Sequence, residues 1–255
     1  MTTLPEAFLR LPIAHRAYHD KTQGRPENSR AAIRAAIDAG YGIEIDLQLT
    51  ADGQAVVFHD YELKRLTCAT GTVRQHSAQE MAQIALSNGD GETVPGFAEV
   101  LEIVAGQVPL LVELKDQDGA MGPNTGALEA AAAKALQGYE GPLAVMSFNP
   151  HSMAEMARLA PDVPRGLTTS GYDPQDWPLT AETCAHLREI PDFDRVGACF
   201  ISHEAKDLSR PRVGALHDSG VPVLCWTIRS PEAEAEARKR ADNITFETYA
   251  ARMPS

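Results

Sequence analysis

The sequence contains no long hydrophobic run and no cysteine pair with metal-type spacing. No segment of its 255 residues approaches the ~18 uninterrupted apolar residues of a membrane-spanning helix, so we expect no stable membrane insertion. No basic region followed by a long apolar run opens the chain, and we therefore expect no signal peptide. The four cysteines fit a reducing cytoplasm, which is the compartment we predict.

Basic residues are also scarce, since 23 Lys and Arg stand against 35 Asp and Glu and give a net charge of −12. A nucleic-acid partner requires a basic surface that displaces counterions, so we expect none. The same charge disfavours adsorption to anionic membranes. The acidic excess serves solubility, or part of it forms a carboxylate cluster that binds cations. The sequence leaves these two interpretations open, and it also leaves the formation of homo-oligomers open.

Short β-rich runs alternate with helical patterns along the whole chain, which predicts a parallel sheet covered by helices. The predicted strands are Pro12–His15, Gly42–Leu49, Ala55–His59, Pro109–Lys115, Leu143–Ser147, Arg165–Thr168, Gly197–Ser202, Pro222–Thr227 and Asn243–Phe246. The predicted helices are Asn28–Ala39, Phe97–Ala105, Thr125–Leu136, Pro150–Leu159, Pro211–Asp218 and Pro231–Arg240.

The third predicted strand, 55–59, follows Thr50-Ala51-Asp52-Gly53, which is hairpin chemistry and too short for a parallel crossover. We therefore expect this strand to fold back antiparallel beside 42–49. The remaining eight strands predict a (β/α)8 TIM barrel, a fold of about 250 residues, as a single domain over 1–255. Residues 61–95 show no clear periodicity, and we interpret them as a small insertion subdomain after the second strand.

Two predicted strands carry charged side chains at alternate positions. Glu44 and Asp46 lie two residues apart, so both point to one face. Glu113 and Lys115 do the same at the C-terminal end of their strand, where the active sites of barrels lie. Carboxylates gathered in a barrel interior repel one another, and a divalent cation such as Mg²⁺ or Ca²⁺ removes that cost. Ion pairs with Arg or Lys are the alternative interpretation.

Two histidines follow strand ends. His15-Arg16 comes directly after the first strand, and His59-Asp60 ends the folded-back strand. Histidine transfers protons near neutral pH, and arginine offers a planar fork that matches a phosphate. Antiparallel counting across the hairpin places His59 opposite Glu44, level with the carboxylates. A structural histidine at the first position and a surface turn at the second are the alternatives.

Aromatic residues stand at two further strand ends. Phe148 follows Ser147, and Trp226 comes near the end of the run 222–227. An aromatic ring at a barrel rim can line a pocket or face a cationic or sugar-like group. A core position is an equally good interpretation of Trp226, and the segment 147–150 is also a plausible helix cap.

In combination, these segments resemble the glycerophosphodiester phosphodiesterase family, within the phospholipase-C-like phosphodiesterase superfamily. The resemblance covers nearly the whole chain and is most specific from 44 to 60. The matching segments are His15-Arg16, Glu27-Asn28-Ser29, Glu44-x-Asp46-x-Gln48-Leu49-Thr50-x-Asp52-Gly53, Val56-Val57-x-His59-Asp60, Glu113-x-Lys115 and Trp226-Thr227.

The resemblance implies a TIM barrel that hydrolyses glycerophosphodiesters to an alcohol and glycerol 3-phosphate, in glycerol and lipid metabolism. It implies two histidines as the acid/base pair, three carboxylates as ligands of Mg²⁺ or Ca²⁺, and a cyclic phosphate that water then opens; direct attack by water stays open. The implied residues are His15 and His59 for catalysis, Glu44, Asp46 and Glu113 for the metal, Arg16 and Lys115 for the phosphate, and Phe148 and Trp226 for the pocket.

Two departures from the family pattern leave the substrate preference undetermined: Ala17 stands where the family has glycine after His-Arg, and Ile228-Arg229 follow Trp-Thr in place of Val-Asn. A third departure is Glu247-Thr248-Tyr249 after the last strand, where an Asp-containing ending is commoner. Two alternative functions also remain: a related phospholipase-type diesterase that cleaves intact or lyso-phospholipids, and a non-catalytic phosphate-binding barrel.

Overall fold

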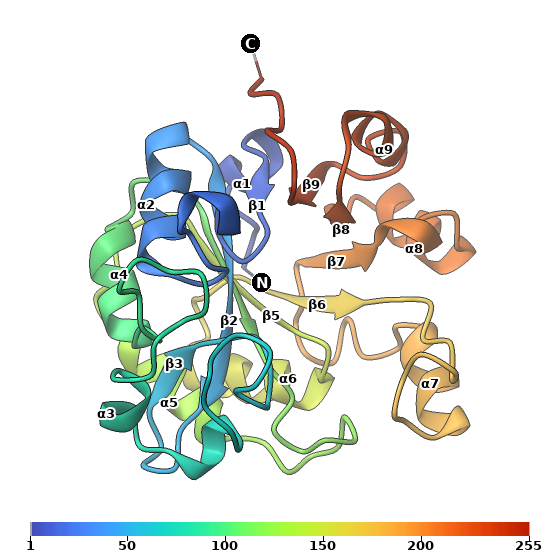
Figure 1. Cartoon of the computed structure of the whole chain (residues 1–255). Helices are drawn as coiled ribbons and strands as arrows, with labels where there is room; N and C mark the ends of the chain where they lie inside the picture. The colour runs from blue at the N-terminus through green and yellow to red at the C-terminus, as the bar shows by residue number, and fades with distance from the viewer. Residues whose placement is uncertain (1, 255) are drawn as a thin grey trace.

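A computed structural model describes residues 2–254 and contains a closed barrel. Eight strands run parallel, and the barrel closes because β1 pairs with both β2 and β9 (Figure 1). The predicted TIM barrel is therefore confirmed. The strands are β1 (Ile13–Ala14), β2 (Gly42–Leu49), β3 (Ala55–Val57), β4 (Leu110–Leu114), β5 (Leu143–Ser147), β6 (Arg165–Thr169), β7 (Phe200–Glu204), β8 (Val223–Ile228) and β9 (Asn243–Phe246).

Helices surround this barrel, with α2, α4 and α5 on one side and α7, α8 and α9 on the other (Figure 1). The cap of α2 shows how the sequence sets their bounds: the Ser29 side chain accepts a hydrogen bond from the Ala32 N–H, and Gly40 ends the helix with φ +75°. The helices are α1 (Ala7–Arg10), α2 (Arg30–Ala39), α3 (Ala78–Met81), α4 (Phe97–Val104), α5 (Ala127–Ala135), α6 (Pro150–Leu159), α7 (Ala181–Arg188), α8 (Pro211–Asp218) and α9 (Pro231–Ala237).

The alternation of side chains along the strands separates two buried layers. In β2, Ile43, Ile45 and Leu47 belong to the large core between the strands and the helices, and the residues between them face the barrel interior. A second core fills the barrel interior next to the carboxylates, toward the N-terminal ends of the strands, where Phe8 of α1 packs with Leu111 and other apolar residues of the strands. The interior is therefore closed at that end by apolar packing, and its polar side chains lie toward the C-terminal ends of the strands.

The strand β3 folds back antiparallel on β2, as predicted, but its register differs from the prediction by one residue. Leu47 pairs with Val57, so antiparallel counting places His59 opposite Ile45 and not opposite Glu44. The reason is the turn: the Thr50 N–H donates to the Gln54 carbonyl and leaves three residues in the loop, with Gly53 at φ +73°. Regular pairing also ends at Val57, two residues before the histidine.

The prediction for β7 is wrong by about three residues. Gly197 has a φ of +60° and Ala198 donates its N–H to the Phe193 carbonyl, so these residues form a turn and not a strand. The strand begins at Phe200 and continues through the polar residues His203 and Glu204. The apolar run 197–202 predicts a strand along its whole length, but only its second half, from Phe200, pairs with β6.

The segment 61–95 between β3 and α4 has a small apolar core of its own. It contains α3, the 3₁₀ helix Val73–Gln75 and isolated bridges such as Glu62 with Thr72. The core also includes Val56 of β3 and Phe58, the residue that follows this strand. Its buried members are Val56, Phe58, Leu63, Leu66, Val73, Met81, Leu86 and Val94.

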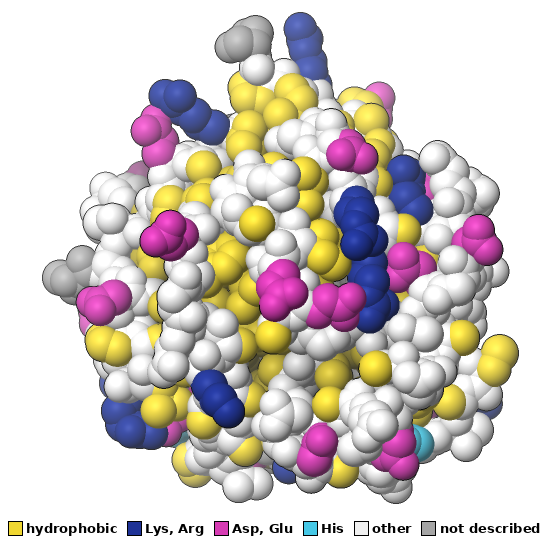
Figure 2. Space-filling model, turned by 90° about the vertical axis from the view of Figure 1, so that its left-hand side faces the viewer, with side chains coloured by type: hydrophobic (Ala, Val, Ile, Leu, Met, Phe, Trp, Pro, Cys, Tyr) yellow, Lys and Arg dark blue, Asp and Glu magenta, His cyan; other side chains and the backbone are white. Residues whose placement is uncertain are grey.

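Figure 2 shows the face over α2 and α4, on the left of Figure 1. Acidic and basic side chains are interspersed on this face, with apolar atoms between them, and the basic atoms right of centre form one short vertical run with acidic side chains on either side of it. One such pair joins the two helices, because Arg30 binds Glu99 through two hydrogen bonds of 2.6 and 2.8 Å. Within residues 2–254, no helix combines the length and the apolar character that crossing a membrane requires.

Candidate active site

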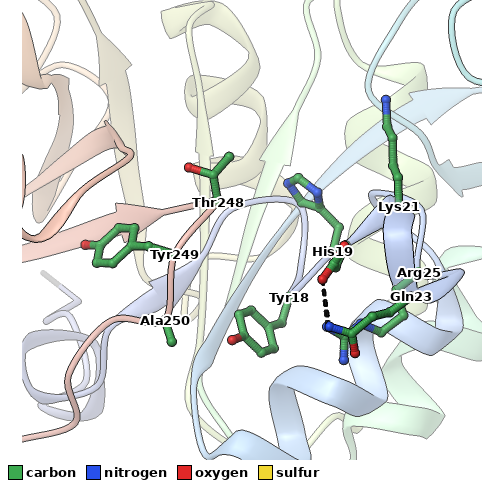
Figure 3. A pocket seen from close by; sticks show the side chains of 9 residues that line it. Tyr18, His19, Lys21, Gln23, Arg25, Thr248, Tyr249 and Ala250 are labelled. Atoms are coloured by element: carbon green, nitrogen blue, oxygen red, sulfur yellow. Dashed lines mark hydrogen bonds and ion pairs between the residues drawn. The ribbon is translucent and has the colours of Figure 1, made fainter.

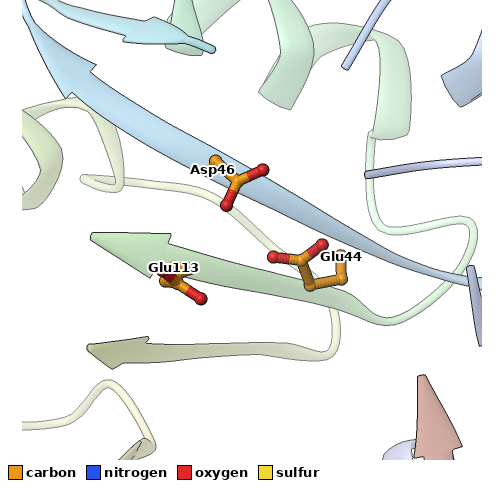
Figure 4. A group of neighbouring side chains, drawn as sticks. All are labelled: Glu44, Asp46 and Glu113. Carbon is orange, nitrogen blue, oxygen red and sulfur yellow. The ribbon is translucent and has the colours of Figure 1, made fainter. Parts of the chain in front are cut away.

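Three carboxylates meet inside the barrel. Asp46 of β2 is paired in register with Glu113 of β4, and Glu44 lies two residues earlier on the same face of β2 (Figure 4). Each of the three offers an oxygen within 4.8 Å of the others, and all three are buried. The structure thus brings together the carboxylates that the sequence pattern placed on two strands.

Cations compensate two of the three carboxylates. The Lys115 Nζ atom lies 2.7 Å from Asp46 Oδ1 and 2.5 Å from Glu113 Oε1. Burial works against the charge of Lys115, but the two carboxylates outweigh it and raise the pKa of the lysine. Burial also works to raise the pKa of Asp46, yet Lys115 and the other nearby cations hold it far below its ordinary value. The ion-pair interpretation therefore holds for part of the cluster.

Glu44 is the carboxylate without a cation. Its side chain is 1% exposed and accepts one hydrogen bond, of 2.8 Å, from the backbone N–H of Arg16; among the described residues it forms no ion pair. Burial and the negative charges of Asp46 and Glu113 raise the pKa of Glu44 well above its ordinary value. An all-oxygen donor set with one uncompensated buried carboxylate fits a hard divalent cation.

His15 follows β1 and is held by Glu247, which follows β9. The His15 Nδ1 atom lies 2.6 Å from Glu247 Oε2, so Nδ1 carries the proton toward the carboxylate and Nε2 remains for a substrate. Burial lowers the pKa of His15, although the hydrogen bond with Glu247 acts in the opposite direction. Burial alone would raise the pKa of Glu247, but its hydrogen bond with His15 and the nearby Arg229 hold it well below its ordinary value.

His59 is held in the same way by its neighbour Asp60. The His59 Nδ1 atom lies 2.7 Å from Asp60 Oδ1, and Asp60 accepts two hydrogen bonds, of 2.6 and 2.8 Å, from Arg65. Arg65 also donates two bonds of 2.8 Å to Glu27, which accepts a third bond, of 2.7 Å, from Arg16. Arg65, in the segment 61–95, therefore links the second histidine to the predicted phosphate-binding arginine.

Glu27 is the central carboxylate of this network. Burial works to raise its pKa, but the hydrogen bonds and charges of Arg65 and Arg16 outweigh burial and lower the pKa of Glu27 to about 2. The next residue, Asn28, donates its side-chain N–H to Asp46 Oδ2 at 2.9 Å. The segment 27–28 thus positions both the arginine and one carboxylate of the cluster.

These side chains surround a cavity of about 180 Å³ at the C-terminal ends of the strands. Every predicted site residue lines it except Asp46, which binds Lys115 directly. The aromatic rings of Phe148 and Trp226 lie on one side, with centroids 5.5 Å apart and planes at 85°. The cavity is lined by His15, Arg16, Glu44, His59, Glu113, Lys115, Met146, Phe148, Thr168, Ser202, Trp226, Thr227, Arg229 and Thr245.

Two of the departures from the family pattern have a structural reading. Ala17 has a φ of +64°, so it keeps the left-handed conformation that glycine adopts freely, and its methyl group is buried at 1% exposure. Arg229 lines the cavity and binds Glu247 Oε1 at 2.8 Å. Neither residue displaces a predicted catalytic side chain.

A larger cavity of about 500 Å³ lies beside the site (Figure 3). It shares no lining residue with the site cavity, and Glu247 lies between them, 2.6 Å from His15 and 3.6 Å from His19. It is lined by Tyr18, His19, Asp20, Lys21, Gln23, Arg25, Thr248, Tyr249 and Ala250.

Five residues of the site network have no role predicted from the sequence, and one of them, Arg65, lies in the segment 61–95 outside the quoted motifs. Glu27, Asn28 and Asp60 stood inside the quoted motifs, so a signal for them existed. Glu247 was noted only as a departure, and its partner His15 lies 232 positions away in the sequence, so no local pattern links the two.

Two carboxylate-held imidazoles and an acidic cluster thus lie together at the C-terminal face of a TIM barrel, which is where the active sites of barrel enzymes lie. The model of the glycerophosphoryl diester phosphodiesterase family matches residues 15–245. The chain therefore belongs to this family.

Relatives agree with that assignment, and a solved structure agrees with the fold. A glycerophosphodiester phosphodiesterase of Caldanaerobacter subterraneus is 33% identical over 166 residues, which cover 62% of this chain and 65%, just under two thirds, of that protein. One of Bacillus subtilis is 28% identical over 78% of this chain and 70% of its own length. An Oleispira antarctica phosphodiesterase in complex with the product sn-glycerol-3-phosphate has a similar fold, with a TM-score of 0.76 at 24% identity over 93% of both chains.

Proposed function

We propose that this enzyme hydrolyses glycerophosphodiesters to an alcohol and glycerol 3-phosphate with the help of a divalent cation. The family assignment supports the reaction class, and the Oleispira phosphodiesterase of similar fold is described with sn-glycerol-3-phosphate as its product. The single observation that carries the proposal is the orientation of the two imidazoles. Each has Nδ1 held by a carboxylate within 2.7 Å, which leaves Nε2 for proton transfer, and both line the cavity that contains the acidic cluster.

Glu44, Asp46 and Glu113 would hold the cation, as Mg²⁺ or Ca²⁺. When bound, the cation supplies charge neutralisation and polarisation of the phosphoryl group. Arg16 and Lys115 would hold the phosphate and stabilise the charge that develops on it. Lys115 would then divide its three N–H donors between the substrate and its two carboxylate partners.

The two imidazoles would act as base and acid in turn. One removes the proton of the glycerol 2-hydroxyl, whose oxygen attacks phosphorus, while the other donates a proton to the leaving alcohol oxygen as its bond to phosphorus breaks. Water then opens the cyclic phosphate, with the imidazoles in exchanged roles. Glu247 and Asp60 hold the protonated forms in place during each step.

Replacement of each histidine tests this proposal. His15→Ala and His59→Ala should each lower kcat on glycerophosphocholine by about 10² or more, because each removes a general acid or base. EDTA should abolish the wild-type activity, and Mg²⁺ or Ca²⁺ should restore it. Turnover near the wild-type value in both variants, or activity that survives EDTA, contradicts the proposal.

A parallel assay on phosphatidylinositol micelles tests the phospholipase-type alternative, which requires faster cleavage of the intact lipid than of glycerophosphocholine.

We also propose the cytoplasm as the site of the reaction, because the four cysteines are all free thiols: Cys68, Cys184, Cys199 and Cys225.

A further inference from the structure

A second cavity, the one drawn in Figure 3, lies between the segments 18–25 and 248–250, which follow β1 and β9. Its volume of about 500 Å³ falls within the ~300–1,000 Å³ of cavities that enclose small molecules, whereas the catalytic cavity measures about 180 Å³. The two cavities share no lining residue. The proposed reaction therefore gives the larger of the two no role.

The negative charge in the wall of the second cavity is already engaged. Among the described residues that line it, Asp20 alone carries a carboxylate. This carboxylate accepts hydrogen bonds of 2.9 and 2.7 Å from the backbone N–H and the hydroxyl of Thr22, and one of 2.8 Å from the Gln23 side chain, which is the dashed line of Figure 3. The oxygens of Asp20 are thus held by their own loop and do not attract a cationic ligand strongly.

The two cations of the wall, in contrast, have donors to spare. Lys21 is exposed, and its Nζ atom forms no ion pair or hydrogen bond within residues 2–254. The Arg25 guanidinium donates no hydrogen bond in the same part of the chain, and its ion pair with Asp20 is long, at 3.8 Å. The Nε atom of Arg25 is buried without a partner. A buried N–H donor without an acceptor is costly, so a ligand oxygen at this position would be favoured.

Two tyrosine rings complete the wall, and packing holds both of them in place. Tyr18 lies under the Arg25 guanidinium, with 5.2 Å between the guanidinium carbon and the ring centroid, and meets Tyr41 edge to face at 5.2 Å. The ring centroid of Tyr249 lies 5.5 Å from that of Phe246. The aromatic faces and the arginine are therefore positioned before any ligand binds, which lowers the entropic cost of binding.

These groups favour an anion with several oxygens, although the chain as a whole has a net charge of −12. The planar fork of an arginine matches phosphate oxygens, and the flexible stem of a lysine adds a second charge. A phosphate monoester carries a charge of about −1.5 to −2 and three strong acceptor oxygens, so it can use both cations. A neutral or cationic ligand would leave the donors of Lys21 and Arg25 unpaired.

We propose that the second cavity is a binding site for a small phosphate monoester, held by Arg25 and Lys21 with its organic part against Tyr249. The site goes beyond the proposed function, because it contains none of the catalytic groups and its occupation requires no hydrolysis. The ligand comes from one of two sources, a monoester with an aromatic ring, such as a nucleoside monophosphate, or one without, such as glycerol 3-phosphate. Stacking on Tyr249 would favour the first by about 2- to 10-fold in affinity.

Calorimetric titration of the wild-type protein in EDTA tests the site with inorganic phosphate, glycerol 3-phosphate and AMP as probes. We expect dissociation constants of about 1 mM or lower for the two monoesters, rising with NaCl. Acetate, with one charge and two oxygens, should bind about tenfold more weakly or less. Tighter binding of AMP than of glycerol 3-phosphate supports the aromatic source, and the reverse order supports the other. Binding of no probe, or acetate binding as tight as that of the monoesters, overturns the inference.

Variants locate the bound probe. Arg25→Gln should weaken AMP binding about tenfold or more, and Lys21→Gln about 3- to 10-fold. Both variants should fold, because neither side chain donates a hydrogen bond within the described part of the chain. Lys134→Gln removes the same charge from an exposed position of α5 outside the cavity, and it should leave the affinity unchanged.

The catalytic cavity also has predicted phosphate-binding cations, and Arg16→Gln separates the two sites. Binding in the second cavity predicts that AMP binding survives Arg16→Gln and is weakened in Arg25→Gln. The opposite pattern places the probe in the catalytic cavity and overturns the inference. The proposed function fails separately, since an absence of hydrolysis would contradict that function and leave AMP binding untouched.

Discussion

Replacement of Glu44 by Gln should make the cation-free protein more stable while it removes the activity. The three carboxylates have oxygens within 4.8 Å of one another, and two unit charges at that distance repel by about 3.5 kcal/mol at an effective dielectric constant of 20. Asp46 and Glu113 share Lys115, whereas Glu44 has no cation among the described residues. After allowance for the partial compensation by Lys115, we expect Glu44→Gln to raise the free energy of unfolding by about 1–3 kcal/mol at pH 8 in EDTA.

The pH dependence fixes the sign of this effect. The pKa of Glu44 is raised in the folded protein by burial and by the two neighbouring carboxylates. Its ionisation therefore costs stability above the ordinary pKa of a glutamic acid, and the cost grows as the pH rises toward the raised value. The advantage of the Gln variant should be largest at pH 8 and should disappear near pH 4.

Urea unfolding of the two proteins in EDTA at pH 4.5, 6 and 8 measures this difference. Asp46→Asn is the matched control and should destabilise at pH 8, because the charged form of Asp46 is bound to Lys115 and its pKa is lowered. With a saturating cation the order of wild type and Glu44→Gln should reverse. A Gln variant that is less stable than wild type in EDTA at pH 8, or a difference that does not vary with pH, would refute the electrostatic argument.

Three further predictions follow from the contacts around the site. Arg65→Ala should lower kcat about tenfold and the free energy of unfolding by about 1–2 kcal/mol, because Asp60, which orients the His59 imidazole, loses its own partner. Arg74→Ala, in the same segment 61–95, should change neither quantity. Ala17→Gly should change the free energy of unfolding, measured in urea, by less than about 1 kcal/mol, because relief of the left-handed strain offsets the lost methyl contact. Ala36→Gly, at a buried position of α2, should lower it by about 2 kcal/mol, and equal losses in the two variants would contradict the strain argument. Glu247→Gln should lower kcat and move the acid limb of the kcat/KM profile to lower pH, because the negative partner that raises the imidazole pKa is gone; an unmoved limb would count against this role.

Strongly patterned elements could be predicted from the sequence alone. The strands 42–49, 143–147 and 243–246 have the predicted bounds because apolar runs between turn residues define both of their ends. The helix α7 was not predicted, since its only buried residues are Cys184 and Leu187 and its pattern is weak. The register of the hairpin between β2 and β3 was also predicted wrongly, because one additional residue in the turn shifts every pair that follows.

The site residues also divide into those that local spacing predicts and those that depend on tertiary contacts. Side chains two residues apart on one strand share a face by geometry alone, so the cluster of Glu44, Asp46 and Glu113 was accessible from spacing. The bond between His15 and Glu247 was not, because it depends on the closure of β1 against β9. The network through Arg65 likewise depends on how the segment 61–95 packs against the barrel, which no repeat or period in that segment indicates.

The seam between β1 and β9 makes the orientation of His15 depend on the closure of the barrel. His15 follows β1, but the carboxylate that orients its ring follows β9. A barrel in which β9 had separated from β1 would therefore keep the acidic cluster and the pair of His59 with Asp60, but the His15 ring would have lost its partner. Under the proposed mechanism, opening of this one seam would stop hydrolysis while most of the core remained folded.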